Sequence, residues 1–191
     1  TAAVVLAAFV IARRIGLVTG ANRGIGLAIC RQLASNGVTV LLGARDAAAG
    51  EQAAAALRAE GLDIQSIRID TADPQSFESA RDFLAHKFGH LDILVNNIGM
   101  GFDWGHTAAD VPMRLLRETF EINFFSLVDL TQRLLPLIRL SHAGRIVNHS
   151  SAIGSLARRA DQAAWSEGDW PLAYSASKTA LNAFTLHLAC A

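Results

Sequence analysis

Short apolar runs alternate with longer helical segments along this chain, and this alternation constrains its fold more than any other feature. The apolar runs, which we interpret as strands, cover residues 15–19, 38–42, 64–69, 91–95 and 145–149. The helical segments between them cover residues 25–35, 47–60, 74–88 and about 112–140. Strands that are apolar on both faces and alternate with helices are typical of a parallel sheet covered on both sides. The sequence therefore predicts a three-layer α/β/α domain with a doubly wound parallel sheet, whose ligands bind beyond the carboxyl ends of the strands. Pro136 is expected to kink or loosen the end of the last helical segment.

The bulk composition narrows the class of partner. A chain of 191 residues with 51% hydrophobic residues, 15 glycines and 4 prolines is expected to form one folded domain. Its 17 basic and 17 acidic residues balance, so we expect a small-molecule partner and no nucleic acid. Cys30 and Cys190 lack metal-ligand spacing, which predicts no metal site. We interpret both thiols as small buried hydrophobes in a protein of the reducing cytoplasm.

Residues 1–14 read as an apolar N-terminal extension, ahead of a single domain at 15–191. Residues 2–12 are all apolar and are followed by Arg13 and Arg14. This run is too short to span a bilayer, and a secretory signal carries its basic residues before the apolar stretch rather than after it. We expect an extra strand or helix packed on the domain, or a remnant of cloning, and no membrane association. A trimmed membrane anchor is the alternative.

A glycine-rich turn links the first predicted strand to its helix. Glycines at three positions of the turn let the backbone bend tightly and approach a pyrophosphate without a Cβ in the way. The helix that follows presents unpaired N–H groups and the positive end of its dipole. Such a turn in the first strand–helix unit is typical of a Rossmann-like dinucleotide site. The residues expected to bind the cofactor here are Gly20, Asn22, Arg23, Gly24, Ile25 and Gly26.

Two arginines indicate which nicotinamide nucleotide binds. An acidic residue at the end of the second strand would pair with the ribose hydroxyls of NAD and repel a 2′-phosphate. Instead, Arg45 follows the second strand and Arg23 lies inside the turn. Guanidinium groups suit a phosphate because they bind it through paired hydrogen bonds. We therefore expect NADP(H) rather than NAD(H), while Asp46 could weaken this preference or simply cap the next helix.

Tyr174-Ser-Ala-Ser-Lys178 places a phenol and an ammonium four residues apart in a segment that reads as a helix. Residues at i and i+4 share one helix face, so the two head groups can meet over a common site. A free tyrosine ionises near pH ~10 and is a poor acid at neutral pH. A nearby cation favours the phenolate and brings the phenol into range for proton transfer.

Four motifs in order resemble the short-chain dehydrogenase/reductase family, in its carbonyl-reductase-like branch. They are the glycine-rich turn, Asn96-Asn97-Ile98-Gly99 after the fourth strand, Ser150-Ser151 after the fifth, and Tyr174 with Lys178. The resemblance covers residues 19–191. It implies a Rossmann-like fold and hydride exchange between a nicotinamide cofactor and a carbonyl or alcohol substrate.

The resemblance also implies a role for each matching residue of the catalytic end. Tyr174 would exchange a proton with the substrate oxygen, and Lys178 would activate the tyrosine and hold the nicotinamide ribose. Ser151, rather than its neighbour Ser150, would hydrogen-bond the substrate oxygen, because Ser-Ala-Ile-Gly154 fits the serine-x-x-glycine pattern of the family. Asn123 would help bind a water that links the lysine to solvent; the alternative is that it simply interrupts a helix.

Further positions match the cofactor end of the family. Asp70, which closes the third strand, would hold the adenine end, or else is only a turn residue that starts a helix. Asn97 and Gly99 match the loop beside the adenine ribose. Ile98 stands where the family usually has alanine, so its larger side chain is expected to reshape this wall.

Two departures from the family pattern affect the expected function. Ser151 and Tyr174 are separated by a segment that reads as an insertion, containing Arg158, Arg159, Trp165, Glu167 and Trp170. This insertion, with Phe102 and Trp104, is expected either to wall the substrate site or only to pack the loop down. The chain also ends where family members continue through further strands and a lid, so we expect the last strands of the fold to be lacking and the fifth strand to be an exposed edge.

Three functions fit these observations. The first is an NADP(H)-dependent oxidoreductase that interconverts a carbonyl and an alcohol. The second is a nucleotide-binding fragment or pseudoenzyme of the same family with impaired turnover. The third is a scaffold that uses its long central helices as oligomer interfaces, since a full-length family member is expected to form a homo-oligomer.

Overall fold

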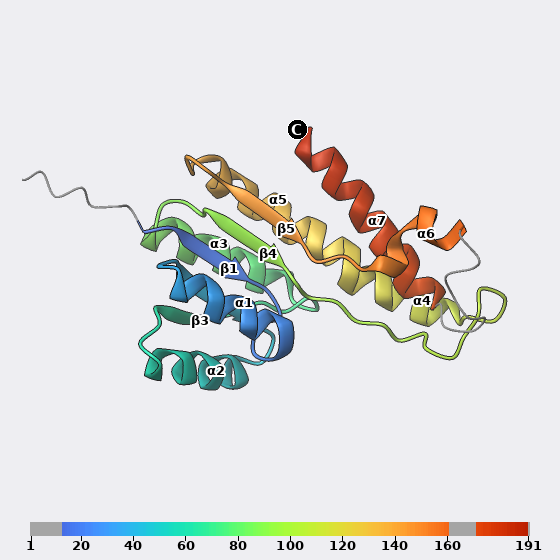
Figure 1. The fold of residues 1–191 in the computed structure, drawn as a ribbon, viewed down its shortest axis with the longest axis horizontal. Helices are drawn as coiled ribbons and strands as arrows, with labels where there is room; N and C mark the ends of the chain where they lie inside the picture. Colours follow the sequence, from blue (N-terminus) through green and yellow to red (C-terminus); the bar gives the residue numbers. More distant parts are fainter. Residues whose placement is uncertain (1–12, 161–170, 191) are drawn as a thin grey trace, which may run out of the picture.

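A five-stranded parallel sheet forms the centre of the protein in the computed structural model, which describes residues 13–160 and 171–190 (Figure 1). The strand order is β3-β2-β1-β4-β5. The strands are β1 (Ile15–Val18), β2 (Thr39–Ala44), β3 (Ile64–Arg68), β4 (Ile93–Asn96) and β5 (Arg145–Asn148). The five predicted strands and the doubly wound topology are therefore confirmed. Of the predicted extension at 1–14, only Arg13 and Arg14 lie within the described residues.

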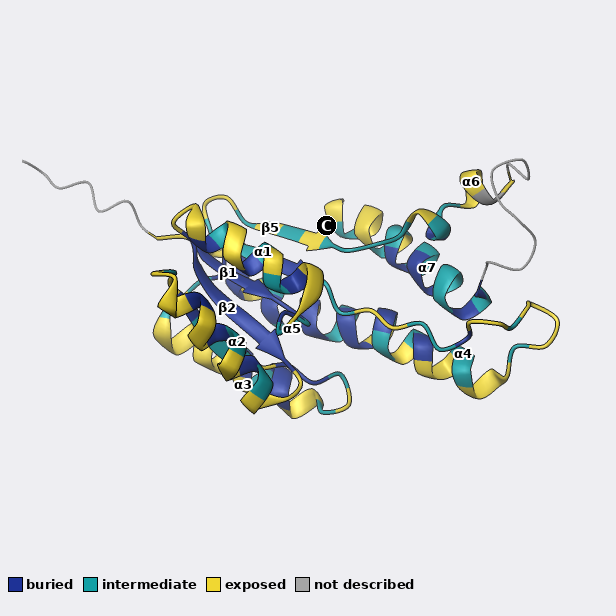
Figure 2. Ribbon diagram, turned by 60° about the horizontal axis from the view of Figure 1, so that its bottom comes forward, coloured by how far each residue is buried: buried dark blue, intermediate teal, exposed yellow. Residues whose placement is uncertain are grey.

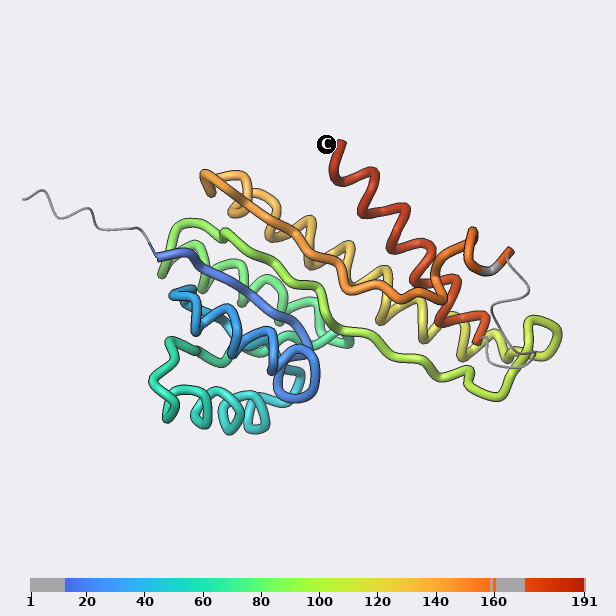
Figure 3. Tube along the Cα trace, viewed as in Figure 1, coloured from blue at the N-terminus to red at the C-terminus, as the bar shows by residue number. Residues whose placement is uncertain are grey.

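The chain order places a switch point between β1 and β4. From β1 the chain moves outward through β2 to β3, then returns to pair β4 on the other side of β1. Val18 is in register with Leu42 of β2 and with Val95 of β4, so the three strands end at the same edge of the sheet. Ligands of open parallel sheets bind at such an edge. Figure 3 shows the turn after β1 and the segment after β4 leaving this edge together.

Helices cover the sheet on both faces and create two apolar clusters. The first contains Leu17 of β1 with Phe77 and Leu134, and the second contains Val18 of β1 with Cys30 and Leu57. Successive strand residues point to opposite faces, which is why neighbours in β1 belong to different clusters. Figure 2 shows the central strands buried and the outer helix faces exposed. The first cluster is covered by α3 (Pro74–Lys87) and α5 (Ser126–Arg139), and the second by α1 (Gly24–Ser35) and α2 (Ala47–Ala59).

The predicted helical segment at 112–140 consists of three parts. They are α4 (Met113–Phe120), the π-helical turn η1 (Glu121–Phe125) and α5. The helical segment changes from α-helix to π-helix at η1. At Pro136, where we expected a kink or loosening, α5 continues as an α-helix to Arg139. The remaining elements are η2 (Ala152–Gly154), α6 (Leu156–Ala160) and α7 (Leu172–Ala189), which packs against α4 and η1.

The two cysteines differ in their surroundings. Cys30 is fully buried in the second cluster, and this burial raises the pKa of its thiol to about 12, as expected of a small hydrophobe. The same interpretation is wrong for Cys190, which is exposed at the C-cap of α7 because the helix ends there.

β5 forms one edge of the sheet in the described part of the chain. Its residues alternate between exposed and half-buried, and Val147 is 50% exposed. The expected exposed edge is therefore present. None of the helices that the structure describes combines the length and the apolar character needed to cross a bilayer.

Candidate active site

Hydrogen bonds connect the predicted motifs at the carboxyl edge of the sheet. The side-chain amide of Asn97 donates to the backbone oxygens of Thr19 (3.0 Å) and Gly20 (3.2 Å). The Oδ1 of Asn97 lies 3.0 Å from Nδ1 of His149, and the backbone oxygen of His149 accepts a 2.8 Å bond from Nζ of Lys178. The glycine-rich turn, the β4 loop, the end of β5 and α7 therefore form one continuous polar arrangement.

The glycine-rich turn disfavours a side chain at Gly20 because of its backbone conformation and at Gly26 because of close packing. Gly20 has a φ of +62°, a conformation that side chains disfavour. A Cβ on Gly26 would lie 2.6 Å from the oxygen of Gly20 and 2.7 Å from Nδ2 of Asn97. The turn is also joined to β2 by a 2.9 Å bond from the N–H of Ala21 to the oxygen of Gly43.

The start of α1 has the features of an anion site. Its N-cap residue, Arg23, makes no side-chain cap, and the first turn contains no acidic residue. The first N–H groups of the helix therefore remain available to a ligand. Arg23 and Arg45 are both exposed, and neither pairs with a carboxylate among residues 13–160 and 171–190. Asp46 caps α2 by accepting from the N–H groups of Ala48 and Ala49. These features fit the phosphates of a dinucleotide.

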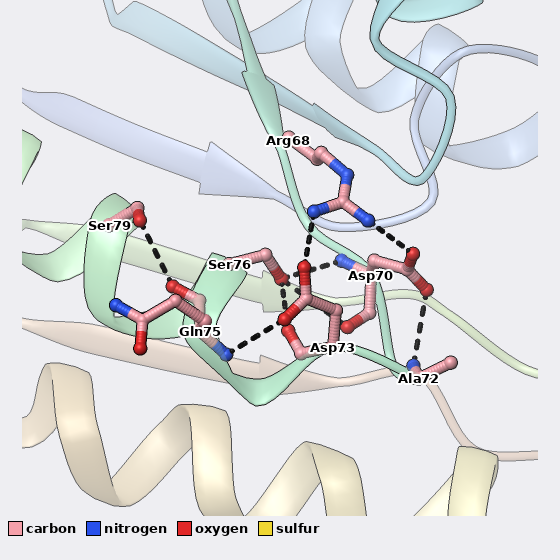
Figure 4. A network of polar contacts seen from close by, with 7 residues as sticks. All are labelled: Arg68, Asp70, Ala72, Asp73, Gln75, Ser76 and Ser79. Atoms are coloured by element: carbon pink, nitrogen blue, oxygen red, sulfur yellow. Dashed lines mark hydrogen bonds and ion pairs between the residues drawn. The ribbon is translucent and has the colours of Figure 1, made fainter.

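Asp70 is held by a polar network at the end of β3 (Figure 4). Its carboxylate accepts a 2.7 Å bond from Arg68 and a 3.1 Å bond from the N–H of Ala72. The Arg68 guanidinium also binds Asp73 and lowers the pKa of that carboxyl. Asp70 is thus a turn residue, as one of its two interpretations predicts; its contact with adenine stays a prediction.

Lys178 and Tyr174 lie together on α7, as their spacing predicts. The Nζ of Lys178 is 5.7 Å from the centroid of the Tyr174 ring, and the lysine is only 2% exposed. A Cβ on Gly99 would lie 3.1 Å from this Nζ, so a glycine at this position leaves room for the ammonium. Burial lowers the pKa of Lys178 to about 8.

Asn123 is fully buried in the π-helical turn and binds two neighbouring segments. Its Oδ1 accepts from the N–H of Met100 and its Nδ2 donates to the oxygen of Met100, each over 2.8 Å. The Nδ2 also lies 3.0 Å from Oγ of Ser177. Asn123 thus lies where the helix changes to a π-turn, and its bonds hold the β4 loop against α7. π-Turns of this kind are frequent at functional sites.

The two candidate serines point to different partners. The Oγ of Ser151 accepts from the N–H of Ile153 (3.4 Å) and caps η2, whereas the Oγ of Ser150 donates to the backbone oxygen of Lys178 (3.5 Å). Ser151 therefore keeps its hydroxyl proton available to a further acceptor. A Cβ on Gly154 would lie 2.7 Å from Cβ of Lys178, which explains the glycine of this motif by close packing. No hydrogen bond joins Ser151 to Tyr174 within the described segments.

Sequence reasoning missed two residues of this region. His149 links Asn97 and Lys178, through its side chain and its backbone oxygen respectively. Asp103 is fully buried, and its Oδ2 accepts a 2.6 Å bond from the N–H of Ala173 in the first turn of α7. The N-cap residue of α7 is Pro171, which has no side-chain acceptor, and this was the available signal that α7 is capped from elsewhere.

Three other predictions concern this region. Ile98 packs beside Gly20 and against the first apolar cluster, and its effect on the wall beside the adenine ribose stays a prediction. Trp104 contacts the ring of Tyr174, whereas Trp165, Glu167 and Trp170 lie outside the described residues. Among the residues that the structure describes, no His, Cys, Asp and Glu side chains group to hold a metal ion.

The arrangement defines a Rossmann-like fold with its polar motifs gathered at the carboxyl ends of the strands, and comparison with known proteins identifies its family. The family described as short chain dehydrogenase matches residues 14–191, so the chain belongs to it. Carbonyl reductase [NADPH] 1 of Mus musculus is 43% identical over 143 residues, which cover 74% of this chain and 50% of that protein. Short-chain dehydrogenase/reductase 1 of Saponaria officinalis is 34% identical, over 95% of this chain and 78% of that protein.

Solved structures confirm the Rossmann-like fold. Salutaridine reductase from Papaver somniferum superposes with a TM-score of 0.79 at 31% identity, over 93% of this chain and 82% of that chain. The Pseudomonas aeruginosa RhlG/NADP active-site complex gives a TM-score of 0.78 at 34% identity, over 93% of this chain and 66% of that one. The chain spans about half the length of the carbonyl reductases that it matches.

Proposed function

We propose that this protein is an NADP(H)-dependent oxidoreductase that interconverts a carbonyl and an alcohol of a small molecule. The observation that carries this proposal is the contact between Lys178 and Tyr174 at the carboxyl edge of the sheet, joined through His149 and Asn97 to the glycine-rich turn. A pure nucleotide binder would not need a phenol and a buried ammonium at this position.

The cofactor would lie across the switch point between β1 and β4. Gly20, Gly26 and the open N-terminus of α1 would receive its pyrophosphate, while Arg23 and Arg45 would bind a 2′-phosphate. Asp70 would contact the adenine, and Asn97 and Gly99 would border its ribose. When bound, the cofactor supplies or accepts the hydride. The NADPH-dependent carbonyl reductases and the RhlG/NADP complex support this choice of nucleotide.

The residues of this chain would transfer one proton to or from the substrate oxygen and would stabilise the charge that develops on that oxygen. Tyr174 would donate a proton to the carbonyl oxygen in reduction and accept it in oxidation. Lys178, held by the oxygen of His149, would favour the phenolate and contact the nicotinamide ribose. Ser151 would donate a hydrogen bond to the substrate oxygen as charge develops on it. Asn123 would hold the β4 loop and α7 in place and help bind a water that links Lys178 to solvent.

Replacing Tyr174 by phenylalanine tests the proposed proton transfer. We expect Tyr174→Phe to bind NADPH as the wild type does and to lose at least about 100-fold in kcat, the contribution typical of a general acid. NADPH fluorescence measures binding, and oxidation of NADPH with a panel of aldehydes and ketones measures turnover. Substantial residual activity in the variant would exclude Tyr174 as the proton donor.

The adjacent serines provide a matched pair for the oxygen-binding role. Ser151→Ala is expected to lower kcat about 100-fold, as loss of one donor to a developing oxyanion does, while Ser150→Ala stays within a few-fold. Equal effects of the two variants would reject the assignment of Ser151. If the wild type binds NADPH but reduces no carbonyl, the second candidate, a nucleotide-binding protein with impaired turnover, is correct.

A further inference from the structure

Trp104 is a large aromatic side chain that lies beside the proposed proton donor and is open to solvent. Its ring centroid is 6.1 Å from that of Tyr174 with an interplanar angle of 34°, and the residue is 62% exposed. Aromatic side chains usually bury most of their surface in a core. Core packing therefore does not account for the position of Trp104.

The surrounding loop holds Trp104 in this position. Its neighbour Asp103 is fully buried and accepts a bond from the N–H of Ala173, the residue that precedes Tyr174. A Cβ on Gly101 would lie 2.9 Å from Nε1 of Trp104 and 3.3 Å from Cδ2 of Tyr174. The indole and the phenol thus share one contact with the backbone of the loop. Figure 3 shows this segment running from β4 towards the first turn of α7.

The two contacts of the Tyr174 ring differ in exposure and polarity. Lys178 contacts the ring from a buried position, bound to the end of β5 and against Gly99. Trp104 contacts the same ring but is mostly exposed. Of these two side chains, the indole is therefore the one that a molecule arriving from solvent can reach.

We propose that Trp104 determines substrate specificity by stacking on a flat ring attached to the reacting carbonyl, so that aromatic aldehydes and ketones are preferred over linear aliphatic ones. This inference rests on the proposed function and deepens it. An indole face offers both apolar area and a quadrupole that favours offset or tilted aromatic contacts. A linear alkyl chain receives the apolar contact from any side chain of similar size, so it gains less from the indole.

The test compares benzaldehyde with hexanal at saturating NADPH, in the full chain. We expect Trp104→Leu to lower kcat/KM for benzaldehyde about three- to tenfold and for hexanal less than about twofold, with Trp104→Phe in between. Phe83→Leu is the control, because Phe83 is an exposed aromatic on α3 that contacts Phe88 and Lys87, remote from Tyr174. NADPH affinity and thermal unfolding of each variant show that the fold and cofactor site are intact.

The outcomes separate this inference from the proposed function. A benzaldehyde-to-hexanal ratio of kcat/KM that falls in Trp104→Leu and is unchanged in Phe83→Leu supports the inference. A ratio that is the same in the wild type and Trp104→Leu overturns the inference alone, since turnover itself persists. A wild type that oxidises NADPH with neither of these aldehydes but with other members of the panel overturns the inference alone. A wild type that oxidises NADPH with no aldehyde or ketone of the panel overturns the proposed function, and the specificity role of Trp104 falls with it.

Discussion

The ammonium group of Lys178 donates a 2.8 Å hydrogen bond to the backbone oxygen of His149. This bond joins α7 to the end of β5 and holds the lysine beside Gly99 of the β4 loop, where a Cβ would lie 3.1 Å from its Nζ. The lysine is almost fully buried, yet no carboxylate pairs with it in the described part of the chain. A buried ammonium with one neutral acceptor is costly to keep charged, and that cost has a measurable consequence.

Stability is expected to depend on the ionisation of Lys178. Burial lowers its pKa from 10.5 to about 8. Below pH ~8 the lysine is protonated in both states, and its burial costs the folded state on the order of 3 kcal/mol. Between the folded and unfolded values the unfolded chain binds more protons, so the free energy of unfolding rises with pH.

Comparing the wild type with Lys178→Met tests this effect, and the same comparison made with Tyr174→Phe in both proteins removes any contribution of the neighbouring phenol. The free energy of unfolding of the wild type, minus that of the variant, should increase by about 3 kcal/mol as pH passes through this window. Urea unfolding at pH values below, within and above the window measures the difference. A constant difference would show that Lys178 titrates alike in the folded and unfolded states.

Asn123→Ala is expected to destabilise the fold by about 2–4 kcal/mol, because it leaves both the N–H and the oxygen of Met100 without their partner. Asn182→Ala is the matched control. Asn182 makes one 3.2 Å bond to the oxygen of Gly154, which also accepts from Thr179, so its loss should cost less than about 1 kcal/mol. Urea unfolding measures the free energy of unfolding of both variants. A similar decrease in the two variants would contradict a special role for the two bonds between Asn123 and Met100.

Gly26→Ala should weaken NADPH binding at least about tenfold, equivalent to about 1.4 kcal/mol, because its Cβ would push apart Gly20 and Asn97. Gly61→Ala is the control, since Gly61, unlike Gly26, has a positive φ, and no atom lies within 4 Å of the point that its Cβ would occupy. It should reduce stability without changing affinity. NADPH titration by fluorescence checks both, and unchanged binding in Gly26→Ala would reject the turn as the pyrophosphate site.

Arg45→Asp should shift the NADPH-to-NADH ratio of kcat/KM towards NADH by at least about tenfold, because a charge-assisted bond to the 2′-phosphate is replaced by repulsion. Arg139→Asp makes the same change of charge in the last turn of α5. This turn directly precedes β5 and so lies at the amino ends of the strands, away from the carboxyl ends where the cofactor would bind. The NADPH-to-NADH ratio of kcat/KM of Arg139→Asp should equal that of the wild type. An unchanged ratio in Arg45→Asp would exclude a role in phosphate recognition.

Local sequence patterns were sufficient to predict the elements of this fold. Apolar runs and glycine-rich turns act over a few residues, so the strands, the turn at Gly20 and the shared helix face of Tyr174 and Lys178 could be predicted directly. The same patterns could not place the π-turn at Asn123. The side chain in this turn binds the backbone of Met100, which belongs to another segment and is not part of any local pattern.

The sequence by itself determined which side chains are candidates for binding a dinucleotide and moving a proton, because a glycine, a phenol and an ammonium keep their chemical character in any fold. How these residues are held depends on the folded chain. Asp103 caps α7 from 70 residues away, and Asn97 binds the turn after β1 from 78 residues away. Such bonds form only after parallel strands bring their carboxyl ends to one edge, and no local pattern encodes which distant backbone group will be there.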